Sequence, residues 1–212
     1  MTSDGKKRLT MLTRARYDRV APFYDLMEAL MERLAFARWR KELWSMVGGQ
    51  RLLEVGVGTG KNTPYYPHGV KVAAIDLSPQ MLAGARRRGK GMGEKVDLYV
   101  MDVEDLAFPD DTFDTVVASF VFCSVPDPVR GLQEQGRVVR PGGRIVLLEH
   151  MRSDIPLLGC LMDFLNPLIV RLTGANINRS TLENIRRAGL EIEEERELSP
   201  AGIVKLIVAK PQ

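Results

Sequence analysis

Two patterns of apolar residues alternate along most of the chain. Short apolar runs bounded by glycine or an acidic residue predict buried strands, and stretches with a period near 3.6 predict amphipathic helices. The expected strands cover residues 52–55, 71–76, 96–101, 113–119, 144–149, 190–198 and 203–209. Strands that alternate with helices build a mostly parallel sheet with helices on both faces, so the pattern predicts an α/β fold.

The helical stretches cover residues 9–46, 80–88, 129–139 and 181–188, and Ser180 precedes the last one as its cap. Pro22 is expected to break the first stretch, because proline lacks an amide hydrogen and clashes with the preceding turn. We therefore predict a second helix beginning there. Residues 140–143, Arg-Pro-Gly-Gly, are expected to form a turn.

Residues 155–170 form an apolar run with one charged side chain, Asp163. Pro156 and Pro167 interrupt the run, and it is shorter than the roughly 18 to 20 residues that a membrane-spanning helix needs. The segment therefore predicts a helical cap. An apolar cap of this kind favours a lipophilic or amphiphilic substrate, although it could instead complete the core or a dimer contact.

Three alternating glycines follow the first predicted strand, in the sequence RLLEVGVGTG. Gly56, Gly58 and Gly60 allow a sharp turn and the close approach of a nucleotide-like ligand. A dinucleotide fingerprint would need its third glycine where this chain has Lys61. Glu54 places a negative charge beside the loop, which suits a cationic ligand such as S-adenosylmethionine (SAM), with its sulfonium and ammonium groups.

Asp76 lies at the end of the second predicted strand, 20 residues after Gly56. This distance suits a carboxylate that accepts hydrogen bonds from ribose hydroxyls. Together, Glu54, the three glycines and Asp76 resemble the first motifs of the class I SAM-dependent methyltransferases. The resemblance implies a Rossmann-like seven-stranded sheet whose last strand is antiparallel.

The resemblance also assigns roles to residues outside these motifs. Asp102 and Val103 would contact the adenine ring, and the cofactor set extends to Asn62, Leu77, Met81 and Ser119. The segment RYDRVAPFYDLMEALMERLAFARWR resembles the N-terminal segment of quinone-methylating and phospholipid-methylating members. Tyr17 and Tyr24 would then belong to a lid over the cofactor, with Tyr24 a candidate for a catalytic role. A plain amphipathic helix docked on the sheet is the alternative.

The acceptor site is expected near the ends of the fourth and fifth strands. Phe120 and Phe122 predict an apolar site there with few hydrogen-bond donors, and Arg179 could meet an anionic head group. His150 follows the fifth strand at the edge where open α/β sheets bind their ligands, so it is a candidate base. It could equally be a structural hydrogen-bond partner. No His, Asp or Glu set has ligand spacing, so no metal is expected.

Composition limits the remaining choices. With 212 residues, 45% of them hydrophobic, and a net charge of +3, the chain suits one α/β domain and does not require nucleic acid as a partner. We expect a lid at residues 1–47, a cofactor core at 48–150, a substrate cap at 151–180 and a closing helix and strand pair at 181–212. Cys123 and Cys160 lie far apart, and the first residues do not resemble a signal peptide, so a cytoplasmic setting is favoured.

These observations favour transfer of a methyl group from SAM to a lipophilic acceptor. The amine of a phospholipid such as phosphatidylethanolamine comes first, ahead of a quinone carbon or a small thiol. The basic, apolar N-terminal helix could also lie on the anionic inner membrane surface. A SAM-binding module without turnover and, more weakly, a dehydrogenase remain alternatives, and the oligomeric state is left open.

Overall fold

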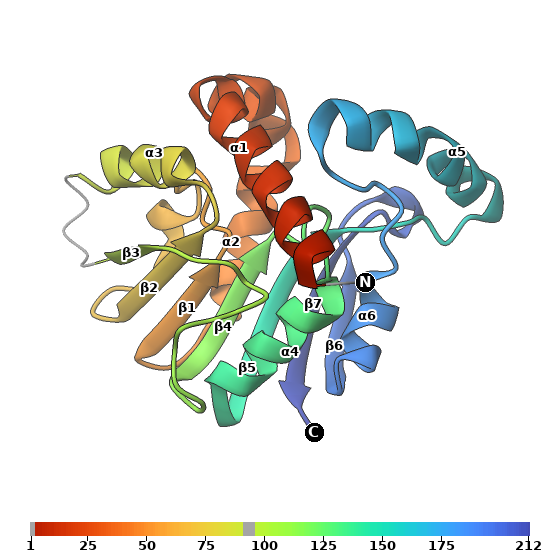
Figure 1. Cartoon of the computed structure of the whole chain (residues 1–212). Helices are drawn as coiled ribbons and strands as arrows, with labels where there is room; N and C mark the ends of the chain where they lie inside the picture. Colours follow the sequence, from red (N-terminus) through yellow and green to blue (C-terminus); the bar gives the residue numbers. More distant parts are fainter. Residues whose placement is uncertain (1–2, 91–95) are drawn as a thin grey trace.

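The computed structural model describes residues 3–90 and 96–212. These residues form one seven-stranded sheet in the order β3-β2-β1-β4-β5-β7-β6 (Figure 1). The strands are β1 (Arg51–Val55), β2 (Lys71–Asp76), β3 (Val96–Val100), β4 (Phe113–Ser119), β5 (Val139–His150), β6 (Leu190–Glu197) and β7 (Val204–Pro211). The first five are parallel, and β7 runs antiparallel to both β5 and β6. The predicted α/β fold with an antiparallel last strand is confirmed.

The central strands are apolar on both faces because helices cover both faces. On one face, α2 (Ala37–Ser45) packs on β5 and buries Leu43 in the apolar cluster that includes Leu52 of β1, and α3 (Pro79–Gly89) covers β2 and β3. On the other face, α4 (Pro128–Val138) and α6 (Thr181–Arg187) bury Leu132 and Ile185 against β4, β5 and β7 (Figure 1). Short 3-10 turns occur at η2 (Thr63–Tyr65) and η3 (Pro200–Gly202).

The N-terminal segment departs from the expected pair of helices. Helix α1 (Ser3–Met31) continues through Pro22 and passes into a π-helical turn, η1 (Glu32–Phe36), before α2 begins. The predicted break at Pro22 is therefore wrong. Pro22 lies on the exposed side of α1, where water can satisfy the carbonyl that loses its partner. Contacts to the body of the protein hold the helix on both sides of the proline.

Two further boundaries differ from the sequence expectation. Helix α5 (Pro156–Thr173) also runs through its internal proline, Pro167, so only Pro156 acts as a boundary, at the first helical positions. Strand β5 begins at Val139 instead of residue 144. The expected turn remains as an irregularity within it, because the register jumps from Phe113 opposite Val139 to Thr115 opposite Arg144.

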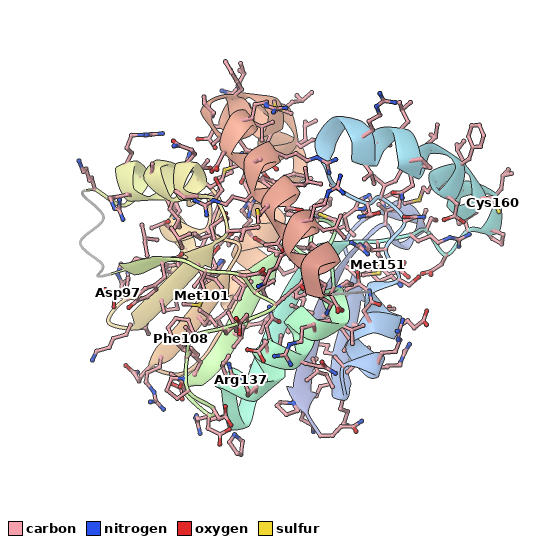
Figure 2. The ribbon with its side chains drawn as sticks, viewed as in Figure 1. Asp97, Met101, Phe108, Arg137, Met151 and Cys160 are labelled. Carbon is pink, nitrogen blue, oxygen red and sulfur yellow. The ribbon has the colours of Figure 1, made fainter. Side chains whose placement is uncertain are left out.

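Helices α1 and α5 both lie along the upper side of the molecule, above the carboxyl ends of the parallel strands (Figure 1). Figure 2 places Met151, which follows β5, on this side, and Arg137 of α4 toward the opposite side. No helix in the described ranges is long and apolar enough to span a membrane.

Candidate functional site

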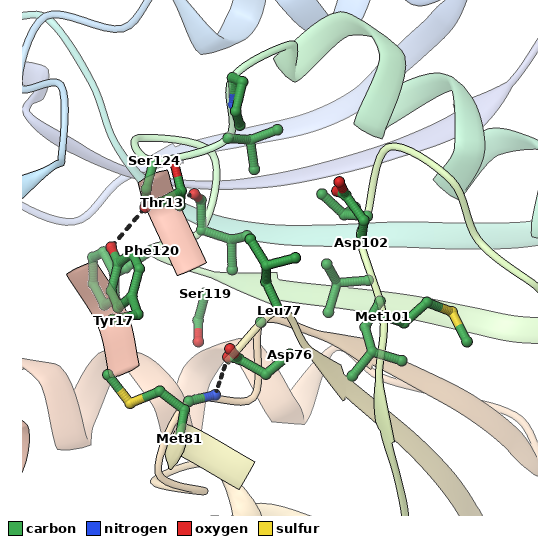
Figure 3. Close-up of a pocket in the computed structure, with 18 of the residues that line it drawn as sticks. Thr13, Tyr17, Asp76, Leu77, Met81, Met101, Asp102, Ser119, Phe120 and Ser124 are labelled. Carbon is green, nitrogen blue, oxygen red and sulfur yellow. Dashed lines mark hydrogen bonds between the residues drawn. The ribbon is translucent and has the colours of Figure 1, made fainter. Parts of the chain in front are cut away.

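A cavity opens at the carboxyl ends of β1, β2 and β4, beneath α1 (Figure 3). Open α/β sheets bind their ligands at this edge, where the strand order reverses between β1 and β4. Its lining consists of Thr13, Tyr17, Tyr24, Val55, Gly56, Gly58, Ile75, Asp76, Leu77, Met81, Met101, Asp102, Val103, Ser119, Phe120, Val121, Ser124, Val125 and Pro126. Residues from five separate stretches of the sequence meet there, from α1 to the segment before α4.

The glycine turn shapes one wall of the cavity, and its three glycines play different parts. Gly56 and Gly58 line the cavity with φ values of +67° and +56°. A side chain at Gly56 would lie 2.4 Å from Val121, whereas one at Gly58 would enter open space. Gly60, with φ +83°, lies outside the lining and lets the turn pack on Ala85 of α3. The backbone can therefore approach a ligand closely at Gly58.

Two carboxylates face the cavity from neighbouring strand ends. Asp76 accepts hydrogen bonds from the amides of Gly58, at 2.9 Å, and Ser78, at 2.8 Å. Asp102, which follows β3, accepts a bond from the amide of Glu104 at 3.0 Å. Burial raises the pKa of Asp76 to about 6, although the two amides oppose this shift. Leu77, Met81 and Val103 complete an apolar slot between the two acids.

Helix α1 closes the cavity through polar side chains. The Tyr17 hydroxyl lies 2.7 Å from that of Ser124 (Figure 3). Asp18 accepts a hydrogen bond from Ser78 at 2.6 Å. Further along the helix, Asp25 bonds Thr59 at 2.6 Å and Glu28 bonds Lys61 at 2.9 Å. The helix is thus fastened to the glycine turn and to the start of α3. Helix α1 therefore covers the cavity, at the place where the sequence analysis expects a lid.

The second lid tyrosine, Tyr24, also lines the cavity. Burial raises the pKa of its phenol well above the ordinary value, with the nearby Glu28 adding to the effect. The phenol therefore stays protonated at neutral pH and can act only as a hydrogen-bond donor or acceptor.

Glu54 and Asn62 lie outside the cavity lining. Glu54 is fully buried, and its carboxylate accepts hydrogen bonds from Asn62 at 2.7 Å and from the Tyr66 hydroxyl. Asn62 also donates to Ser119, at 2.8 Å, and Ser119 does line the cavity. The predicted acid and amide therefore stand behind the wall of the cavity and orient a residue that lines it.

Three predicted acceptor residues also lie outside the lining. Phe122 is 1% exposed and belongs to the core beside α4, whereas Phe120 faces the cavity. His150 ends β5 opposite Val204, and burial lowers the pKa of its imidazole. Arg179 is partly buried and donates to the carbonyl of Val125 at 2.7 Å, so it supports a lining residue from behind.

Sequence reasoning missed Arg40, which joins the lid to the cavity wall. This arginine is 6% exposed and donates to Glu32 at 3.2 Å and to both Asn62 and Ser119 at 3.1 Å. Its guanidinium also lies 5.7 Å from the centre of the Phe120 ring. Arg40 is one of several basic residues in this segment, so the sequence alone does not indicate that this one is buried. Only the fold shows that it meets Asn62 and Ser119.

Replacing Arg40 with methionine is expected to lower the free energy of unfolding by about 2 to 3 kcal/mol. This lies below the roughly 3 to 5 kcal/mol expected for losing one partner of a fully buried ion pair, because Glu32 stays partly hydrated. Urea unfolding would measure the change. Arg38→Met, at an exposed position on the same helix, is the matched control and should change stability little. Equal stability of the two variants would contradict a central role for Arg40.

The residues of the cavity suit SAM. The open space at Gly58 would admit a ligand against the backbone, and Asp76 and Asp102, at adjacent strand ends, would accept hydrogen bonds from ribose hydroxyls and an adenine amino group. The sheet order, the glycine turn and the paired acids together define the class I methyltransferase fold. When bound, SAM supplies a methyl group on a sulfonium centre that is already activated for transfer.

Comparison with known proteins agrees with this class. Residues 53–147 match a family model described as "Methyltransferase domain". The chain is 34% identical to the demethylmenaquinone methyltransferase of Clavibacter sepedonicus over 215 residues, which cover 91% of this chain and 87% of the relative. The chain belongs to the SAM-dependent methyltransferases.

A second relative shares more identity over a shorter stretch. The phosphatidylethanolamine N-methyltransferase of Cereibacter sphaeroides is 51% identical over 108 residues, which cover 50% of this chain and 53% of the relative. This match therefore spans about half the length of each protein.

Solved structures show the same fold at low identity. A SAM-dependent methyltransferase of Thermotoga maritima, described as a possible histamine N-methyltransferase, superposes with a TM-score of 0.70 at 22% identity and covers 93% of this chain and 99% of its own. Geranyl diphosphate methyltransferase in complex with SAM gives 0.69 at 20% identity, with 83% and 84% covered.

Proposed function

We propose that this protein transfers the methyl group of SAM to a lipophilic acceptor, with the amine of a phospholipid such as phosphatidylethanolamine favoured. The observation that carries this proposal is the reversed amphipathic character of α1. Its acidic side chains Asp18, Asp25 and Glu28 bond to the body of the protein, whereas its largest aliphatic side chains face outward. The exposed apolar residues of α1 and η1 include Phe23, Leu26, Met27, Leu30 and Leu34, which are 63% to 78% exposed.

Helix α5 adds a second outward apolar face on the same side of the molecule. Leu157 and Phe164 are 83% and 81% exposed. Leu161 and Leu168 are also exposed, and the four residues are three or four positions apart, so they lie on one side of the helix. Gly174, which follows α5, lies beside the side chain of Arg16 of α1. We infer that the apolar faces of α1 and α5 together lie on an anionic bilayer, because exposed Arg8, Arg19 and Arg33 accompany the apolar residues.

For methyl transfer, the protein mainly has to align the acceptor with the methyl group and exclude water from the site. The lone pair of the acceptor nitrogen forms a bond to the methyl carbon while the carbon–sulfur bond breaks, and the sulfur keeps the electron pair. A nitrogen that arrives protonated must first lose a proton to water or to a base. Phe120 and Val121 would form an apolar wall for the acceptor, and Tyr24 would offer its phenol as a hydrogen-bond partner. His150 is the candidate base, and Arg179 and Phe122 would support the site from behind.

Radiolabelled methyl transfer to a panel of acceptors tests the proposal. The panel holds phosphatidylethanolamine vesicles, a demethylated quinone and an aliphatic thiol, with products separated by chromatography. We expect labelled phospholipid. Label in the quinone alone would move the acceptor to a ring carbon, a reading supported by the demethylmenaquinone relatives. SAM binding without transfer to any acceptor would favour a non-catalytic binding module.

A further inference from the structure

The wall of the cavity includes a turn with unusual backbone geometry. Ser119, Phe120 and Val121 all line the cavity, and the chain reverses at Phe120, whose φ is +58°. Bulky side chains rarely adopt this left-handed conformation, so the surrounding structure must hold it. The amide of Phe120 is held by the carbonyl of Leu148 at 2.8 Å, which ties the turn to β5.

The next two amides of the turn are held by one side chain. Glu149 of β5 accepts hydrogen bonds from the amide of Val121 at 2.9 Å and from that of Phe122 at 3.2 Å, both at the same carboxylate oxygen. Consecutive amides in such a turn form a concave site for an anion. In this protein, a carboxylate from the neighbouring strand fills that concavity.

Burial deprives the Glu149 carboxylate of its hydration. Glu149 is fully buried, and its second oxygen has no hydrogen-bond partner among the described residues. A buried charge of this kind is expensive unless its partners hold it firmly. An apolar side chain at this strand end would carry no such solvation cost, but it could not accept the two amide bonds.

Arg179, before α6, lies outside the turn backbone and lowers the pKa of Glu149. The Cys123 thiol follows the turn, and Glu149 adds to the effect of burial in raising the pKa of that thiol. Burial outweighs the amides and the arginine and raises the pKa of Glu149 to about 7. Burial also raises the pKa of Cys123 to about 12, so this thiol stays neutral while Glu149 titrates.

From this geometry we propose that Glu149 is a positioning residue for methyl transfer, and that its carboxylate holds the turn that presents Phe120 and Val121 to the acceptor. The ionised form binds the two amides more strongly than the protonated form, because charge-assisted hydrogen bonds are about twice as strong as neutral ones. The turn is therefore firm above neutral pH and looser below it. The kinetic part of this inference rests on the proposed function, whereas the structural part does not.

Hydrogen exchange at single amides tests the structural part in the protein without cofactor. After correction for intrinsic exchange rates, we expect the Val121 and Phe122 amides of Glu149→Gln to be about 10-fold less protected than wild type at pH 8. Wild-type protection should decline toward the variant's level between pH 8 and pH 6. Unchanged protection in the variant, or a wild-type protection independent of pH, would overturn the proposal.

Glu134→Gln is the matched control. Glu134 of α4 is also buried and also accepts a backbone amide, that of Leu106 at 3.0 Å, but it pairs with Arg137 on the far side of the molecule from α5 (Figure 2). This variant should lose protection at Leu106 and keep it at Val121 and Phe122. Its thermal midpoint also shows how much a buried glutamate-to-glutamine change affects stability alone.

The pH profile of kcat/KM tests the kinetic part. Wild type should lose activity as pH falls through about 7, and Glu149→Gln should show low activity without that ionisation. A variant that loses amide protection yet keeps wild-type turnover at every pH would overturn the positioning role. If Glu149→Gln loses amide protection but wild type methylates no acceptor, the proposed function is refuted. Glu149 would then remain the residue that holds the turn.

Discussion

Asp76→Ala is expected to weaken SAM binding by about 1.5 to 3 kcal/mol, or roughly 10-fold to 150-fold in the dissociation constant. The substitution removes a charged acceptor from the cavity lining. It also removes the acceptor for the amides of Gly58 and Ser78, which hold the glycine turn and the start of α3 in place. Titration calorimetry with SAM measures the change directly.

An exposed aspartate on the adjacent strand provides the control for this experiment. Asp97 of β3 lies on the outer strand of the sheet, outside the cavity lining, so Asp97→Ala should bind SAM as wild type does (Figure 2). Asp76→Asn keeps the shape and one acceptor but loses the charge, and should fall between wild type and Asp76→Ala. Wild-type affinity in Asp76→Ala would contradict the assignment of this carboxylate to the cofactor.

The same carboxylate gives the binding a dependence on pH. Burial raises the pKa of Asp76 from 3.8 to about 6 in the free protein. Ribose hydroxyls donate more strongly to the ionised form, so affinity should be highest above pH 6 and should fall as the carboxyl gains its proton below that value. Asp76→Asn should bind with an affinity that changes little between pH 7.5 and pH 5.5. A decline of equal size in the variant would assign the titration to another group.

The cofactor half of the molecule was predictable because its signals are local. Strand ends, glycines and acids follow one another at fixed spacing, and parallel strands bring their carboxyl ends to one edge of the sheet. Gly56, Gly58, Asp76 and Asp102 therefore come together as expected. Continuation of α1 through Pro22 was not predictable, since it depends on contacts with Ser78, Thr59 and Lys61 from distant parts of the chain.

The parts of the site that sequence reasoning missed are held by contacts distant in sequence. Arg40 is separated from Ser119 by 79 residues, and Glu149 from Val121 by 28. Nothing in the identity of a lone arginine or a strand-terminal glutamate indicates which backbone or side chain it will meet. The sequence predicts that Glu54 lies beside the glycine turn and faces a cationic ligand. In the structure its carboxylate accepts hydrogen bonds from Asn62 and Tyr66, which follow that turn. Residue spacing predicts which strand end a side chain occupies, not the partner that it meets there.

The outward apolar face of α1 is expected to bind anionic vesicles. Leu26→Glu combined with Leu30→Glu should reduce binding to phosphatidylglycerol-containing vesicles by at least about 100-fold. Each leucine contributes about 1.5 to 3 kcal/mol when it leaves water for an apolar phase, and each glutamate adds repulsion from the anionic surface. Both side chains are exposed, at 78% and 67%, so the fold loses no buried contact. Vesicle co-sedimentation measures the partitioning.

A change in charge alone could also weaken such binding, so the control must match it. Arg186→Gln combined with Arg187→Gln lowers the net charge from +3 to +1, as the two glutamates do, but on exposed positions of α6 away from α1 (Figure 1). This variant should keep most of its vesicle binding. Calorimetry should show wild-type SAM affinity in both variants, because the lid contacts of Tyr17, Asp18 and Asp25 lie on the opposite side of the helix. Equal losses in the two variants would mean that net charge drives the binding, and full binding by the glutamate variant would assign the apolar face to another partner.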